Sequence, residues 1–138
     1  MISATEARLP ATAKARLALE IALTSVRVRW LLRRTDLPTT LARLRPHPAA
    51  VGGHALSVQD SARLARAVTR TLGALPGDAR CLVTSVVVVA VLARRGGAGS
   101  LVIGVRPGSE FGAHAWVERD GVALLPSGPG EFGRLVEL

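Results

Sequence analysis

A single cysteine stands at the head of the longest uninterrupted apolar run in the chain. Cys81 opens "CLVTSVVVVAVLA", thirteen residues that exceed an ordinary strand and favour a helix buried on all sides. The first N–H groups of a helix have no internal partners and carry a partial positive charge, so they stabilise a thiolate and can bind an oxyanion. Position alone leaves two interpretations of Cys81, a small buried apolar residue or a nucleophile.

A histidine follows 33 residues later, in a segment with the alternation of a strand. In "FGAHAWVERDG", alternation sends His114, Trp116 and Glu118 to one face and small or apolar residues to the other. His114 is the candidate general base for Cys81. A lone strand histidine is also commonly a core or surface residue, and Trp116 fits either a pocket wall or the core.

The composition narrows the classes of function. The net charge of +8 comes almost entirely from arginine, which suits nucleic acid, a membrane surface or an acidic protein partner. Only four aromatic residues are present, and they are not interleaved with the arginines as a base-stacking platform would need. One cysteine excludes an internal disulfide, and its spacing from the three histidines matches no zinc site. No metal or cofactor is therefore expected.

The chain has no signal for secretion or for a membrane span. Its first residues lack a basic segment followed by an apolar core, and thirteen apolar residues are too few to cross a bilayer. We expect a cytoplasmic protein with no transmembrane segment. Its 138 residues predict one domain, with a helical N-terminal region at 1–56 and a catalytic core at 57–138.

Helices are expected first and strands afterwards. Apolar spacing, breakers and the N-cap candidate Ser57 predict helices over residues 11–33, 38–45, 57–72 and 81–95, with a loop at 45–55. After Gly96-Gly97 the pattern predicts strands over residues 100–105, 113–118 and 122–125, with "RDG" as the tight turn before the last. This order predicts an α+β fold with a small antiparallel sheet.

The segment from residue 60 to about 125 resembles the B protein family of lasso-peptide biosynthesis. The shared features are Cys81-Leu82 opening a helix, "LARRG", the strand "LVIGVR", and "AHAWVERDG". Members of that family are transglutaminase-like cysteine proteases that remove the leader from a lasso-peptide precursor. The resemblance implies a transglutaminase-like or papain-like fold with Cys81 and His114 as the catalytic pair.

The resemblance also implies partners. This chain resembles the stand-alone peptidase form, whose leader recognition lies in a separate small protein. The expected partners are therefore the precursor leader peptide, that leader-recognition protein and an ATP-dependent lasso cyclase. No nucleic acid is expected as a partner.

One position departs from the family pattern. The family carries an aspartate twelve residues after the histidine, and this chain has Pro126 there, which cannot accept a hydrogen bond through its side chain. Ser127, Glu131 and Asp120 are the candidates for a third catalytic member. Asp120 is also the natural first residue of an Asp-Gly turn, about 20 Å along the strand from His114.

The sequence thus predicts a cysteine peptidase that removes the leader of a ribosomally made lasso-peptide precursor. Two alternatives remain open: a weak or inactive scaffold that binds precursor and partner proteins, and a basic nucleic-acid-binding protein.

Overall fold

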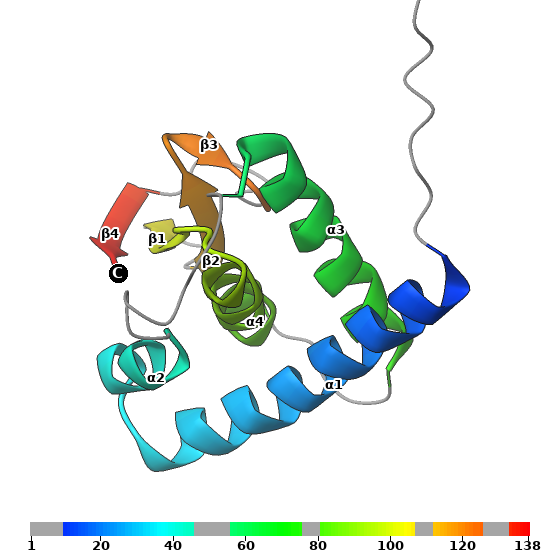
Figure 1. Cartoon of the computed structure of the whole chain (residues 1–138). Helices are drawn as coiled ribbons and strands as arrows, with labels where there is room; N and C mark the ends of the chain where they lie inside the picture. Colours follow the sequence, from blue (N-terminus) through cyan, green and yellow to red (C-terminus); the bar gives the residue numbers. More distant parts are fainter. Residues whose placement is uncertain (1–9, 46–55, 76–80, 107–111, 126–132) are drawn as a thin grey trace, which may run out of the picture.

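Helix α4 (Cys81–Arg94) forms the centre of the fold, as its apolar composition predicts, and every side chain from Ser85 to Leu92 is buried. It packs against the other three helices and against the sheet (Figure 1). The computed structural model describes residues 10–45, 56–75, 81–106, 112–125 and 133–138.

The other helices begin and end close to the predicted residues. They are α1 (Ala11–Arg34), α2 (Leu37–Leu44) and α3 (Val58–Ala74). The predicted N-cap is confirmed, because the Ser57 hydroxyl accepts a hydrogen bond of 3.1 Å from the backbone N–H of Asp60. Asp36 caps α2 in the same way, with its carboxylate 2.8 Å from the N–H of Thr39. The predicted loop at 45–55 lies, beyond Arg45, outside the described residues.

A Schellman motif ends the central helix and turns the chain toward the sheet. The N–H of Gly97 bonds to the carbonyl of Leu92 at 2.8 Å, and that of Gly96 to the carbonyl of Ala93 at 3.2 Å. Gly96 has a φ of 75°, a conformation that costs most L-residues about 1–2 kcal/mol. The Gly96-Gly97 pair therefore sets where α4 stops.

The described strands form one antiparallel sheet in the order β3-β2-β1-β4. They are β1 (Ser100–Arg106), β2 (Gly112–Arg119), β3 (Val122–Ala123) and β4 (Gly133–Glu137). Asp120 and Gly121, with φ values of 51° and 77°, form the tight turn between β2 and β3, as predicted. The α+β prediction is confirmed. The strand expected over 122–125 is shorter, although the N–H of Leu124 still bonds to the carbonyl of Val117 at 2.8 Å.

Strand β4 was not predicted from the sequence. It pairs with β1 at the sheet edge, and all five of its residues are exposed, so it has no apolar alternation to detect. Its pairing continues into Leu138, which exchanges backbone hydrogen bonds of 2.9 and 2.8 Å with Leu101. The side chain of Arg45 also donates to the carbonyl of Leu138, at 3.2 Å.

An ion pair fastens α1 to the end of α4. The guanidinium of Arg95 donates to both oxygens of Glu20, at 2.8 and 2.6 Å, and Arg94 lies 3.5 Å from the same carboxylate. The bonds from Arg95 hold the pKa of the Glu20 carboxyl below its usual value, with the charge of Arg94 adding to the effect.

This ion pair makes stability depend on pH in a defined window. Because the folded pKa of Glu20 is lowered, its contribution is fully present above the unfolded value of about 4.3 and is lost as pH falls through the folded value. We expect Glu20→Gln to be less stable than the parent at pH 6, by no more than about 1 kcal/mol. Urea unfolding of both proteins should show this difference shrinking below about pH 4. A difference that stays constant to the lowest pH would contradict the assignment.

No helix in the described part of the chain is long and apolar enough to cross a membrane.

Candidate active site

Cys81 is exposed at the first residue of α4, whereas the same helix is buried from Ser85 to Leu92. The interpretation of Cys81 as a small core residue is therefore wrong. As the first residue of the helix, the thiol lies beside N–H groups that have no partner within the helix. Such N–H groups can donate hydrogen bonds to an oxyanion.

One turn into the helix, Ser85 carries a buried hydroxyl with no hydrogen-bond partner among the described residues. An unsatisfied buried hydroxyl destabilises a fold, and its removal relieves that cost. We expect Ser85→Ala to unfold at the same urea concentration as the parent or at a higher one, with a gain of about 1 kcal/mol. A loss of stability would show that the hydroxyl has a partner.

His114 lies near the start of β2, opposite Gly104 of β1, and is partly buried. Its ring stacks on the indole of Trp116, with centroids 6.0 Å apart and planes inclined by 20°. The predicted alternation thus places both rings on one side of the strand. Trp116 is 5% exposed, so the stack fixes one face of the imidazole against a buried wall.

Glu118 lies on the same side of β2 as His114 and Trp116, and its carboxylate accepts a hydrogen bond from the indole. Its Oε2 accepts a hydrogen bond of 2.9 Å from Trp116 Nε1, and its Oε1 accepts one of 2.6 Å from Arg134 on β4. Arg134 reaches Glu118 across the intervening strand β1. The side chain of Glu118 is only 9% exposed, so this contact offsets a nearly buried charge. Glu118 and Arg134 therefore hold Trp116, and Trp116 supports His114.

The other side of β2 faces the central helix. Ala115 and Val117 belong to the same buried cluster as α4, together with Leu101. The carboxyl ends of the two elements meet around Gly99, where an added Cβ would lie 3.1 Å from Val117 and 3.2 Å from Leu92. Cys81 and His114 both lie toward the opposite, amino ends of their elements.

The candidates for a third catalytic member separate into two groups. Asp120 lies in the turn at the far end of β2 from His114, where its exposed carboxylate is 3.9 Å from Arg119. The structure does not bring Asp120 to the histidine. Ser127 and Glu131 lie outside the described residues, as does Pro126.

Sequence reasoning missed the supporting role of two residues. The alternation from His114 through Trp116 to Glu118 placed the carboxylate on the right face, and this signal could have identified it as the partner of the indole. No signal pointed to Arg134, because β4 was not predicted. No group of three metal-ligating side chains occurs among the described residues.

Comparison with known proteins gives one match. A family model described as the Transglutaminase-like superfamily matches residues 15–137, which is most of the chain. No curated protein and no solved structure matches significantly.

Proposed function

The chain belongs to the transglutaminase-like superfamily, and from this premise we propose that it is a cysteine peptidase that removes the leader from a ribosomally made lasso-peptide precursor. The observation that carries the proposal is the exposure of Cys81 at the start of a helix that is buried from Ser85 to Leu92. A solvent-accessible thiol at that place is suited to attack a carbonyl, and nothing in core packing requires it. The resemblance of "AHAWVERDG" to the lasso-peptide B proteins supplies the substrate class.

In the proposed reaction, Cys81 Sγ attacks the scissile carbonyl at the junction of leader and core peptide. His114 takes the thiol proton and later gives a proton to the leaving amine. The backbone N–H of Cys81 donates to the oxyanion, and water then hydrolyses the thioester. The pair would form at the amino ends of α4 and β2, because the middle of each element is filled by core side chains.

Trp116 is the proposed positioning group for the histidine. A family member with the usual aspartate would orient the imidazole through a hydrogen bond, and this chain has Pro126 at that position. Stacking on a buried indole restrains the ring, and Glu118 with Arg134 holds the indole. A thiolate needs such an orienter less than a serine does, because the thiol is already acidic.

The proposed partners follow from the same resemblance. They are the precursor leader, a separate leader-recognition protein that delivers it, and an ATP-dependent cyclase that receives the released core peptide. We also propose that the protein acts in the cytoplasm.

The decisive experiment is alkylation of Cys81 by iodoacetamide as a function of pH, for the parent and for His114→Ala. An activated thiolate should react at pH 7 at nearly its maximal rate, whereas a free cysteine, half ionised near pH 8.5, reacts more than tenfold below its maximum. In His114→Ala the profile should move to higher pH. Reaction only after denaturation would remove the peptidase proposal, and an activated thiol without any peptide cleavage would favour the scaffold alternative.

A further inference from the structure

Helix α1 carries a second apolar side that does not pack against the core, where the guanidinium of Arg34 lies 5.4 Å from the ring centroid of Trp30. Four large side chains lie along it, each more than half exposed: Leu19 at 60%, Leu23 at 62%, Val26 at 66% and Trp30 at 53%. Their spacing of four, three and four residues places them on one line of the helix, as in the seam of a coiled coil. We call these four residues the outer seam.

The outer seam lies opposite the side by which α1 joins the core. The buried residues of α1 are Ile21, Thr24, Ser25, Val28 and Leu31. At 100° per residue, their mean direction differs from that of the outer seam by roughly half a turn. The outer seam therefore contributes nothing to the core. Exposed apolar residues that are scattered singly over a surface need no explanation, whereas a contiguous line of four indicates an interaction surface.

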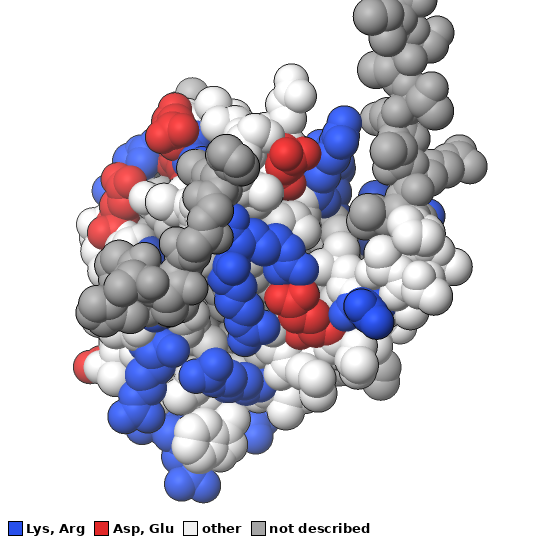
Figure 2. Space-filling model, in the orientation of Figure 1, with Lys and Arg blue, Asp and Glu red and all other residues white. Residues whose placement is uncertain are grey.

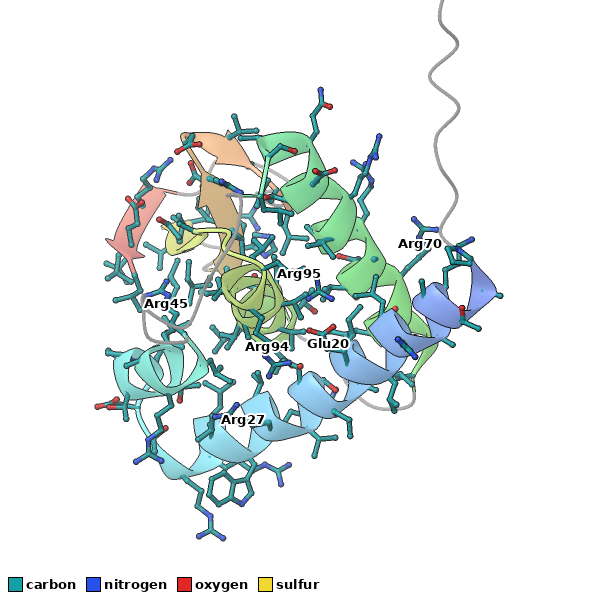
Figure 3. All side chains as sticks on the ribbon, in the orientation of Figure 1. Glu20, Arg27, Arg45, Arg70, Arg94 and Arg95 are labelled. Atoms are coloured by element: carbon teal, nitrogen blue, oxygen red, sulfur yellow. The ribbon has the colours of Figure 1, made fainter. Side chains whose placement is uncertain are left out.

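Arginines border the outer seam along one edge. Leu19 and Leu23 line an open pocket of about 430 Å³ together with Arg16 and Arg27 of α1 and Arg94 of α4. Figure 2 shows basic side chains gathered on this face of the molecule around a small acidic patch. In Figure 3, Arg94 and Arg95 extend from α4 toward Glu20, and Arg27 lies further along α1.

The residues that line this pocket carry a net positive charge. Glu20 is the only acidic residue in its lining, and Arg95, outside that lining, already binds both oxygens of Glu20. The lining therefore holds three arginines and a single carboxylate, and Arg95 already matches the charge of that carboxylate. A ligand for this place must bring negative charge of its own together with apolar side chains for the outer seam.

We propose that the outer seam and its arginine edge dock an amphipathic helix of a partner protein whose apolar side is flanked by aspartate or glutamate. The line of apolar residues fits the apolar side of that helix, and carboxylates on its flank reach Arg16, Arg27 and Arg94. A second copy of this chain is a poorer occupant, since a net charge of +8 and two arginine edges would repel. A bilayer is also a poorer occupant, because the arginine edge borders a hollow into which side chains can enter and a flat lipid surface cannot.

The proposal is independent of peptide cleavage, and its test measures binding alone. The probe is a designed 21-residue peptide without tryptophan, with leucines at coiled-coil spacing and glutamates flanking them, and the matched probe has lysine in place of each glutamate. Trp30 reports the event directly, because it is half exposed whereas Trp116 is buried. We expect a blue shift of tryptophan emission with the glutamate peptide, binding that weakens as salt is added, and no response to the lysine peptide.

Two variants and a matched control locate the binding. Leu23→Gln combined with Val26→Gln, and separately Arg27→Glu, should each weaken binding of the glutamate peptide at least tenfold, with unchanged helix content. Leu135→Gln on β4 replaces an equally exposed apolar residue, at 66%, and should bind as the parent does.

Each remaining outcome would overturn the proposal. These outcomes are failure of the glutamate peptide to bind, equal binding of both peptides, and equal binding by all variants. A dimer of the free chain in light scattering that Leu23→Gln/Val26→Gln dissolves would assign the outer seam to a second copy. Binding to anionic phospholipid vesicles but not to the glutamate peptide would assign it to a membrane surface.

Discussion

The proposed peptide hydrolysis should fall about a thousandfold or more when Cys81 is replaced by alanine, because removal of the nucleophile leaves only oxyanion binding and substrate binding. Cys81 is exposed, so the substitution creates no cavity and the variant should fold as the parent does. The measurement is mass spectrometry of a proteome-derived peptide library, supplemented with lasso-type precursor peptides, after incubation with each protein.

The same helix offers the control. Ser85→Ala changes one atom a single turn away, at a buried residue that reaches no substrate, and should cleave at the parent rate. Equal cleavage by Cys81→Ala and the parent would mean that the activity belongs to a contaminant or to another site. In the same assay Asp120→Asn should be fully active, because the turn that holds Asp120 lies at the far end of β2 from His114.

Two candidates for a third catalytic residue, Ser127 and Glu131, lie outside the described residues. The variants Ser127→Ala and Glu131→Gln test them in the same cleavage assay. A tenfold or larger loss in one of them, with the pH profile displaced, would identify the group that orients His114. Parent-like rates in both variants would mean that stacking on Trp116 orients the imidazole of His114.

The largest change in stability is expected from Trp116→Ala. The indole is 5% exposed, and removal of a large buried aromatic side chain typically costs about 3–5 kcal/mol. The substitution also deprives Glu118 of its donor and His114 of its stacking partner. Urea unfolding followed by circular dichroism measures the loss, and a fold that is unstable before urea is added would agree with the upper end of this range.

Trp116→Phe separates packing from the hydrogen bond. It keeps an aromatic ring beside His114 but removes the indole N–H, so the loss should be about 1–3 kcal/mol. If the indole positions the histidine, Trp116→Phe should also displace the pH profile of Cys81 alkylation in the direction of His114→Ala. Val122→Ala is the matched control, an exposed apolar residue of the same sheet for which neither change is expected. Equal stability of Trp116→Ala and the parent would contradict the assignment of Trp116 to a buried support.

The helical half of the fold could be predicted because its signals are local. Ser57 and Asp36 cap helices through their own side chains, and Gly96-Gly97 ends α4 through backbone geometry that few other residues adopt. Strand β2 was predictable because its sequence alternates, with small or apolar side chains on the face that packs against α4. Strand β4 is exposed along its whole length and exists through its pairing with β1, a contact that no pattern within five residues encodes.

The candidate site shows the same difference between local signals and contacts between distant segments. The places of Cys81, His114 and Trp116 in their elements were predicted, because a helix start and an alternating strand place each of them independently of the other elements. The bond from Arg134 to Glu118 depends on the order of strands in the sheet, which sets β4 beside β1. Only the folded chain makes Glu118 the link between β2 and β4.

Helix α1 is apolar on two sides, and this has a consequence for synthesis on the ribosome. It emerges first, yet its main partner α4 ends sixty residues after α1 does, at Arg94 rather than Arg34. At ordinary elongation rates that interval is about 3–12 s. Throughout it, the nascent chain exposes the part of α1 that will pack against α4, together with the outer seam, which stays exposed even after folding. Yield in recombinant production should therefore depend on chaperone supply and on growth temperature more than the final stability of the protein would suggest.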